Sequence, residues 1–487
     1  MSESTDPAVL DRPHAVHQEG GALPRLAHLS RPQRVSIGKA VRAKTALEAH
    51  AQIPLEGRPD PVALLESQAV SRVPELVPIR YGRMLASPFS FYRGAALVMA
   101  ADLSRTPSSG LMVQLCGDAH MSNFGVYASP ERKLVFDVND FDETHPGPFE
   151  WDVKRLAASL AVAGRDNGFS AKKRRRVVVA AAAGYREAMA HHAEQGNLAV
   201  WYAHLDVDEV MAQVKAQLDS KRVARTRAML DKARGRDSLQ ALAKLTRMVD
   251  GRARIISQPP LIVTVEELYP ADVVSDINDR LLALVRSYRR TLQFDRRHLL
   301  EQFEVVQIAR KVVGVGSVGT RAWILLFEGI DGGDPLFLQA KEAQASVLSG
   351  FVRSHGFKNQ GERVVTGQRL MQASSDIFLG WERALAPDGV QRDFYLRQLR
   401  DGKGSVVVEE MVPEGMTLYA AICGRTLARG HARTGDRVAI AAYLGSSTRF
   451  DEAIADFAER YAEQNDLDHA TLAQAAKAGQ ITVLEGI

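Results

Sequence analysis

The segment 116–152 constrains the fold most, because short apolar runs alternate there with polar loops. The apolar run LMVQL, typical of a short strand, leads into a loop that contains Asp118 and Asn123. A second strand-like run, LVFDV, ends just before Asp140, and the run WDVKRLAASLAVAG has the apolar spacing of a helix that begins at Trp151. We expect these loops to bring their polar side chains together where the strands end.

These residue types suit phosphate chemistry. Magnesium prefers oxygen ligands, and Asn123 offers an amide oxygen while Asp140 offers a carboxylate. A phosphotransferase also needs a carboxylate that orients the attacking hydroxyl and accepts its proton, and Asp118 is the candidate. The purely structural alternative is that Asp118 caps a turn and that Asp140, Asp142 and Glu143 form a solvated acidic loop. We favour the functional interpretation because three spaced elements agree.

A glycine-rich loop occurs much later in the chain. Gly314, Gly316, Ser317 and Gly319 belong to GVGSVG, which lies between two runs rich in β-branched and aromatic residues. Missing side chains let a backbone approach phosphate closely, and its N–H groups can bind the oxygens. A dinucleotide-binding loop would open a helix, whereas a strand follows here, as in kinases. A plain glycine-rich hairpin is the alternative.

Lys341 strengthens the functional interpretation of that loop. It lies in the apolar run FLQAKEA, in the second strand after the glycines, where a lysine needs a partner for its ammonium group. Phosphate oxygens and Glu362, at the start of the next predicted helix, are the candidate partners, since Glu342 should point to the opposite strand face. A lysine that snorkels from an edge strand is the alternative.

These motifs resemble a known family. CGDAHMSN, DVNDFDE and PFEWDVKRLA are similar to the catalytic segment of aminoglycoside and choline phosphotransferases, which are relatives of protein kinases. The resemblance implies that Asp118 is the catalytic aspartate, that Asn123 and Asp140 are metal ligands, and that Asp152 braces the catalytic loop. Cys116 replaces the usual histidine of that loop. The whole chain resembles a bacterial domain of unknown function, which names no substrate.

The order of the motifs is inverted relative to kinases, because the glycine loop follows the Asp118 loop. The sequence therefore predicts an α+β fold of the two-lobed protein-kinase type that is circularly permuted and has a large helical lobe. We expect a flexible arm at 1–60, a helical lobe with the catalytic loops at 61–300, a β-rich nucleotide-binding lobe at 301–405, and helices that complete the helical lobe at 406–487. Alternatively, 61–115 is a degenerate small lobe and 303–410 has another role.

Local patterns predict further elements within these lobes. Helices are expected at 170–192 and at 417–436, the latter ending at Gly435, and the charged stretch 206–255 is also expected to be helical. Strands are expected within 303–343, joined by glycine-rich turns.

Composition excludes some classes of protein. Two cysteines in 487 residues cannot form a disulfide framework, and the N-terminal sequence has no secretory pattern, so a cytoplasmic protein is expected. No apolar run approaches the length of a membrane span. The net charge is only +4, and the run KKRRR at 172–176 is more simply a solvated helix face than a nucleic-acid site.

The sequence thus predicts a phosphotransferase that uses ATP and Mg²⁺ and acts on a hydroxyl of an unidentified small molecule or protein. One alternative is a pseudokinase that binds a nucleotide and a partner without transfer. A metallophosphoesterase with His120 as a ligand is another, although His120 is more simply a loop residue that supports its neighbours. Arg80, Arg83 and Arg93 could meet an anionic substrate or could be surface arginines stacked on aromatic rings.

Overall fold

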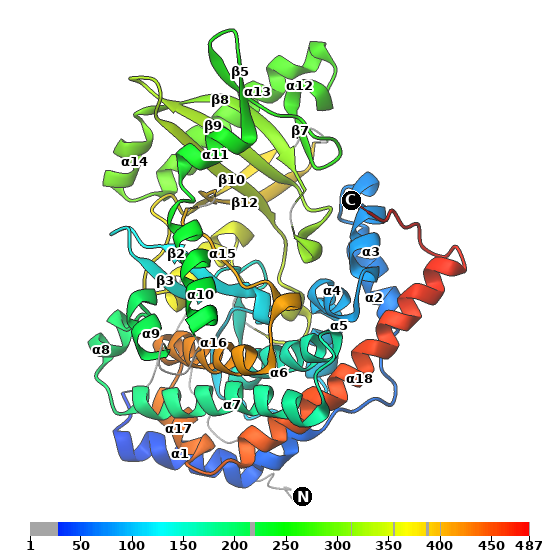
Figure 1. Cartoon of the computed structure of the whole chain (residues 1–487), viewed down its shortest axis with the longest axis vertical. Coiled ribbons are helices and arrows are strands. Elements are labelled where there is room, and N and C mark those ends of the chain that lie inside the picture. Colours follow the sequence, from blue (N-terminus) through cyan, green and yellow to red (C-terminus); the bar gives the residue numbers. More distant parts are fainter. Residues whose placement is uncertain are drawn as a thin grey trace, which may run out of the picture.

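The computed structural model of the chain describes residues 28–214, 220–312, 314–353, 356–385, 389–399 and 401–486. A six-stranded sheet lies at one end of the molecule and most of the long helices lie at the other (Figure 1). We call residues 238–399 the sheet part, and residues 31–234 together with 408–477 the helical part. The α+β class that the sequence predicts is confirmed.

The sheet is antiparallel and has the strand order β11-β12-β10-β9-β8-β7. Its strands are β7 (Ile262–Thr264), β8 (Phe303–Lys311), β9 (Ala322–Gly329), β10 (Pro335–Ala343), β11 (Gly380–Leu385) and β12 (Gln391–Gln398). All residues of β10 are buried, because β10 pairs with β9 on one side and with β12 on the other. The strands that the sequence predicts within 303–343 are confirmed, and Lys341 therefore lies on a central strand rather than on an edge.

Helices cover both faces of this sheet. They are α11 (Ser238–Leu245), α12 (Val265–Leu268), α13 (Ala271–Tyr288), α14 (Phe294–Leu300) and α15 (Gln360–Met371), with short 3-10 turns η5 (Arg289–Thr291), η6 (Val315–Ser317) and η7 (Val347–Gly350). Side chains of α13 pack with Leu325 and Leu338 in one apolar cluster, and side chains of α11 pack with Ile324 and Phe337 in another. Successive residues of a strand point to opposite faces, which explains the two clusters.

Residues 238–300 differ from expectation in two ways. They pack on the sheet, although the sequence analysis assigned them to the helical lobe. Within 206–255, which was expected to be helical, β5 (Thr246–Val249) and β6 (Arg252–Ile255) form a hairpin. Asp250 and Gly251 connect the two strands with φ values of 50° and 75°, and Asp-Gly is a favoured pair for such a turn. The turn signal was therefore present and was missed.

The helical part is built around helices from both ends of the chain. Its helices are α1 (Arg31–Lys44), α2 (Pro61–Ala69), α3 (Val77–Leu85), α4 (Pro88–Gly94), α5 (Ala96–Leu103), α6 (Phe149–Asp166), α7 (Ala171–Ala193), α8 (Asn197–Tyr202), α9 (Val207–Val214), α10 (Ser220–Arg234), α16 (Pro413–Thr434), α17 (Arg437–Leu444) and α18 (Arg449–Lys477). Its 3-10 turns are η1 (Leu47–Ala51), η2 (Pro74–Leu76), η3 (Met121–Asn123) and η8 (Val408–Glu410).

Helices α6, α7, α16 and α18 form the core of the helical part, and α7 and α16 approach each other very closely (Figure 1). A Cβ atom on Gly424 would lie 2.1 Å from the carbonyl oxygen of Ala181, so only glycine allows this approach. The helices predicted at 170–192 and 417–436 are confirmed as α7 and α16, and Gly435 is the C-cap of α16.

Part of the predicted N-terminal arm is folded. Residues 1–27 lie outside the described residues, but α1 packs against α17 at Gly38, where a Cβ atom would lie 2.2 Å from the carbonyl oxygen of Ala439. The ring of His50 is fully buried, and its Nε2 atom is 2.7 Å from the hydroxyl of Tyr443. The second half of the arm thus belongs to the helical part.

Two small sheets lie between the sheet part and the long helices. Strand β1 (Met112–Leu115) pairs with β4 (His145–Pro148), and β2 (Phe124–Ala128) pairs with β3 (Leu134–Val138). The segment that leaves the sheet part runs along β2, since the amide of Gly404 donates to the carbonyl of Val126 at 2.9 Å and the amide of Val126 donates to the carbonyl of Gly404 at 2.8 Å. These pairings fix the loops that carry Asp118 and Asp140.

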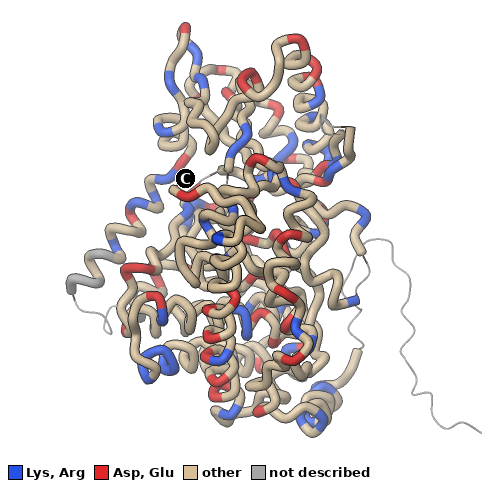
Figure 2. Tube along the Cα trace, turned by 90° about the vertical axis from the view of Figure 1, so that its right-hand side faces the viewer, with Lys and Arg blue, Asp and Glu red and all other residues tan. Residues whose placement is uncertain are grey.

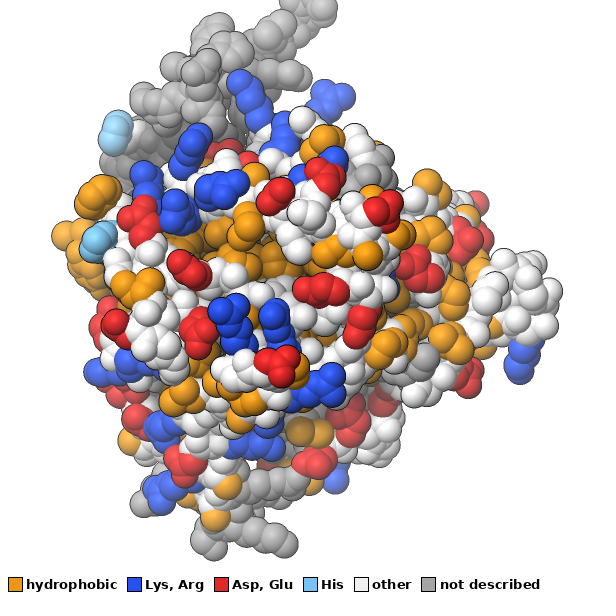
Figure 3. Space-filling model, turned by 90° about the horizontal axis from the view of Figure 1, so that it is seen from above, with side chains coloured by type: hydrophobic (Ala, Val, Ile, Leu, Met, Phe, Trp, Pro, Cys, Tyr) orange, Lys and Arg blue, Asp and Glu red, His pale blue; other side chains and the backbone are white. Residues whose placement is uncertain are grey.

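Charge is mixed along the molecule. Lys and Arg alternate with Asp and Glu in both parts (Figure 2), and the face in Figure 3 carries basic, acidic and hydrophobic side chains next to one another. Among the described helices, none has the length and apolar character that a membrane crossing requires.

Candidate active site

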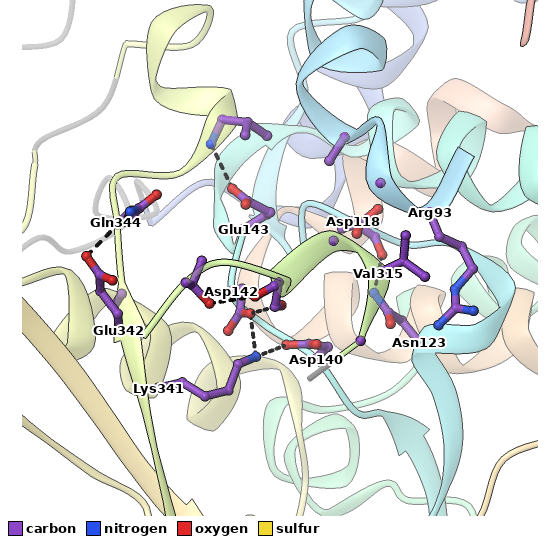
Figure 4. Close-up of a pocket in the computed structure, with 18 of the residues that line it drawn as sticks. Arg93, Asp118, Asn123, Asp140, Asp142, Glu143, Val315, Lys341, Glu342 and Gln344 are labelled. Carbon is purple, nitrogen blue, oxygen red and sulfur yellow. Dashed lines mark hydrogen bonds and ion pairs between the residues drawn. The ribbon is translucent and has the colours of Figure 1, made fainter. Parts of the chain in front are cut away.

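A cavity of about 340 Å³ lies where the sheet part meets the Asp118 loop. Many of the residues singled out in the sequence line it (Figure 4), namely Asp118, His120, Asn123, Asp140, Asp142, Gly314, Gly316, Ser317 and Lys341. Gly319, Glu362 and Asp152 do not line it. The structure thus brings together two segments that are far apart in the chain, because Lys341 and Asp142 interact across 199 sequence positions.

Asp118 is held on one side by an arginine that the sequence analysis missed. Nε and Nη2 of Arg155, on α6, each lie 2.8 Å from Oδ1 of Asp118. Arg155 is buried, its guanidinium lies 3.9 Å from the centre of the Tyr92 ring, and it also donates to the Tyr92 carbonyl at 2.8 Å. Oδ2 of Asp118 is 3.7 Å from Nε2 of His120. One carboxylate oxygen is therefore anchored, and the other is available to a ligand.

Asp152 fixes the backbone of the Asp118 loop. Its carboxylate accepts hydrogen bonds from the amides of Cys116 at 2.8 Å and Gly117 at 3.0 Å, and Nε2 of His431 lies 3.2 Å away. Asp152 is only 1% exposed. Gly117 has a φ of 86°, and a Cβ atom there would lie 2.0 Å from the carbonyl oxygen of Glu143. The loop shape therefore depends on a carboxylate, a histidine and a glycine.

Asn123 and Asp140 offer the oxygen atoms that a magnesium ion would use. Nδ2 of Asn123 donates to the carbonyl of Asp118 at 2.7 Å, which leaves its amide oxygen for another partner. Oδ1 of Asp140 is buried and accepts no hydrogen bond within the described part of the chain. Burial would raise the pKa of Asp140, but Lys341 and Arg397 outweigh burial and lower it. The pair fits a hard cation that takes its other ligands from phosphate and water.

Asn123 and Asp140 offer fewer ligands than a metal site in which protein groups supply every ligand. Across the described ranges, no three His, Cys, Asp or Glu side chains come together in a way that could hold a metal ion.

Lys341 has different partners from the one expected. It is 3% exposed, it forms an ion pair with Asp142, and its Nζ atom is 3.7 Å from Oδ1 of Asp140. Burial disfavours the charged ammonium, but these carboxylates outweigh burial and raise the pKa of Lys341. The predicted pair with Glu362 does not form within the described structure. Both Asp residues follow β3 and reach the lysine through tertiary contact.

Helix α15 contributes Arg363 instead of Glu362. The guanidinium of Arg363 donates to the carbonyl of Thr144 at 2.6 Å and to those of Asp142 and Gln344 at 2.8 Å each. Tyr395, on β12, donates to Oδ1 of Asp142 at 2.5 Å. The acidic loop after β3 is therefore attached to the sheet part by an arginine, a lysine and a tyrosine.

The glycine loop lies over the acidic loop. Oγ of Ser317 donates to Oδ2 of Asp142 at 3.2 Å. A Cβ atom on Gly316 would lie 3.1 Å from the carbonyl oxygen of Arg93, and Gly319 has a φ of 88° and packs against Arg72. Gly319 therefore shapes the loop, whereas Gly314, Gly316 and Ser317 border the cavity.

Three titratable groups of the cavity have unusual environments. Burial raises the pKa of Glu143 to about 7, and its carboxylate accepts a hydrogen bond from the amide of Val347 at 2.7 Å. Burial, together with Arg397, lowers the pKa of Lys403 to about 7. Burial also lowers the pKa of His120 to about 3, so this imidazole is neutral at physiological pH.

The described part of the chain is thus a mixed α+β protein with a charged cavity between its sheet and its helical part. The chain belongs to a family described as "Uncharacterized protein conserved in bacteria (DUF2252)", whose match covers residues 72–475. The predicted membership in a bacterial domain of unknown function is confirmed. No curated protein and no solved structure matches the chain significantly.

Proposed function

We propose that this protein is a phosphotransferase that moves the γ-phosphoryl group of ATP to a hydroxyl of an acceptor. The observation that carries the proposal is the single cavity that joins Asp118, Asn123 and Asp140 to Lys341 and the glycine loop. A base, two oxygen ligands, a phosphate-binding lysine and exposed backbone amides are the parts that phosphoryl transfer requires.

The order of elements in the sheet part supports a kinase-like arrangement. A glycine loop joins β8 to β9, Lys341 lies on the next strand β10, and α15 then precedes β11 and β12. Protein kinases likewise place a glycine loop first, then a lysine on the third strand, then a helix. Because the Asp118 loop precedes all of these elements here, we propose a circularly permuted kinase-like fold.

One feature departs from that pattern. In kinases a glutamate of the helix pairs with the lysine, whereas here Lys341 pairs with Asp142 and α15 supplies Arg363 to backbone carbonyls. The departure concerns the support of the site, and it leaves the lysine, the base and the two oxygen ligands in one cavity.

Each residue has a distinct role in the proposed reaction. Oδ2 of Asp118 accepts the proton of the acceptor hydroxyl, while Arg155 holds Oδ1. The hydroxyl oxygen then bonds to the γ-phosphorus, the bond from this phosphorus to the bridging oxygen breaks, and ADP leaves. Lys341 and the loop amides bind phosphate oxygens. Asn123 and Asp140 would hold magnesium, which when bound supplies positive charge to the phosphate oxygens.

The proposal is tested by calorimetric titration of ATP, with and without magnesium, into the wild type, Lys341→Ala and Asp140→Asn. We expect magnesium-dependent binding that both substitutions weaken, because both side chains line the cavity. Asp118→Ala should retain ATP binding and lose about 10²–10⁴-fold in turnover once an acceptor is found. ATP binding that is absent, or that neither substitution affects, would contradict the proposal.

The pseudokinase alternative has its own outcome in the same experiments. A protein that binds Mg·ATP through Lys341 and Asp140, yet transfers phosphate to no member of a broad panel of hydroxyl compounds and proteins, would be a nucleotide-binding module.

A further inference from the structure

Three arginines from the helices before β1 form a cationic cluster beside the cavity. Arg72 follows α2, Arg80 lies on α3 and Arg93 lies on α4. Arg72 and Arg93 line the cavity together with Gln68, and Arg80 lies behind them, where it donates to Oε1 of Gln68 at 2.9 Å. Arg72 is 7% exposed and Arg80 is fully buried.

The charges of this cluster are not compensated by ion pairs. Within the described residues, none of the three guanidinium groups forms an ion pair with a carboxylate, and Nε of each is buried without a hydrogen-bond partner. Glu143 and Glu342 act on Arg72 only through space, as Asp118 acts on Arg93. A buried charge without a partner is costly, so such a cluster is expected to have an anionic ligand.

Arg93 lies on the Asp118 side of the cavity, where the Asp118 carboxylate acts on its guanidinium through space. In Figure 4, Arg93 and Lys341 lie on opposite sides of Val315 in the glycine loop. Arg72 donates a hydrogen bond to the carbonyl of Val318, so one end of the glycine loop is bound to Arg72. Besides Lys341, which is paired with Asp142, the cavity is lined by Arg72 and Arg93, which form no ion pair within the described residues.

We infer that Arg72 and Arg93 form an anion site that binds a phosphate, sulfate or carboxylate group of the acceptor. Guanidinium groups bind such oxyanions through paired hydrogen bonds, and within the described structure Nε of Arg93 is buried without a hydrogen-bond partner. The acceptor is accordingly an anionic alcohol. The conclusion that the bound anion belongs to the acceptor rests on the proposed function, whereas the anion site itself does not.

The test is calorimetric titration of inorganic phosphate into the full chain saturated with Mg·ADP or with Mg·AMP-PNP. We expect phosphate to bind both complexes, because the site is separate from the γ-phosphoryl position. Arg93→Gln should weaken phosphate binding by about tenfold or more and change nucleotide affinity by less than about threefold. Arg93→Lys should retain much of the phosphate binding because it keeps the charge.

Arg175→Gln is the matched control, since Arg175 is a half-exposed arginine paired with Asp456 on the surface. It should leave phosphate binding unchanged. Phosphate that binds the Mg·ADP complex but not the Mg·AMP-PNP complex would overturn the assignment, because the site would then hold the transferring group. If phosphate does not bind, or binds Arg93→Gln as tightly as it binds the wild type, the proposed anion site is overturned. If the protein binds no nucleotide but binds phosphate in a way that requires Arg93, the proposed function and the acceptor assignment are contradicted. That result would still support the anion site.

Discussion

Replacing Asp152 by alanine should destabilise the helical part strongly. The substitution removes the acceptor for the amides of Cys116 and Gly117 and leaves His431 without its carboxylate. A hydrogen bond to a charged group contributes about 1.5–3 kcal/mol, and a buried donor that loses its acceptor costs about as much. Because one buried and one partly buried amide are affected and Asp152 is 1% exposed, we expect a loss of about 3–5 kcal/mol.

The assay is urea unfolding of the full chain followed by circular dichroism, with the free energy of unfolding obtained by linear extrapolation. Asp152→Asn keeps one acceptor oxygen and should lose about half as much. Asp456→Ala is the control, since Asp456 forms a half-exposed ion pair with Arg175, and it should change stability by less than about 0.5 kcal/mol. A loss below about 1 kcal/mol in Asp152→Ala would refute the view that this carboxylate braces the loop.

Two further predictions concern the Asp118 loop and the acidic loop that packs against it at Glu143. Gly117→Ala should lower the free energy of unfolding by about 3 kcal/mol or more, or prevent folding, because φ of Gly117 is 86° and the new Cβ would lie 2.0 Å from the carbonyl oxygen of Glu143. Gly196→Ala is the control, since Gly196 has open space around it, and it should be nearly neutral in the same unfolding assay. Burial raises the pKa of Glu143 to about 7, so folding favours the protonated carboxyl group. The stability of the wild type should therefore fall as pH rises from about 4.5 through about 7, by up to about 3 kcal/mol relative to Glu143→Gln. Parallel pH–stability curves for these two proteins would contradict the second prediction.

The sequence alone was enough to find the elements that carry the candidate site. The strand run before Asp140, the glycine loop at 314–319 and the helix that ends at Gly435 all follow from local patterns. Such patterns are readable because strand alternation, glycine turns and helix caps depend on residues that are neighbours in the chain. The Asp-Gly turn at 250–251 was equally local, and it shows that a signal can be present and overlooked.

Tertiary structure decided how these elements are used. The partner of Lys341 is Asp142 rather than Glu362, and Asp118 is anchored by Arg155, which lies one helical turn after Asp152 on α6. The i, i+3 spacing of Asp152 and Arg155 puts both on one helix face, and it could have suggested that they serve the same loop. No local pattern, however, indicates which carboxylate a buried lysine will meet.

The sequence by itself thus determined the α+β class, the main secondary-structure elements and the candidate chemistry of Asp118, Asn123 and Asp140. Only the tertiary structure decided that residues 238–300 cover the sheet and that Arg72 and Arg93 face the same cavity as Lys341. The physical reason is that secondary structure is largely encoded by neighbours in the chain. Ion pairs and burial depend instead on packing between segments that lie far apart in it.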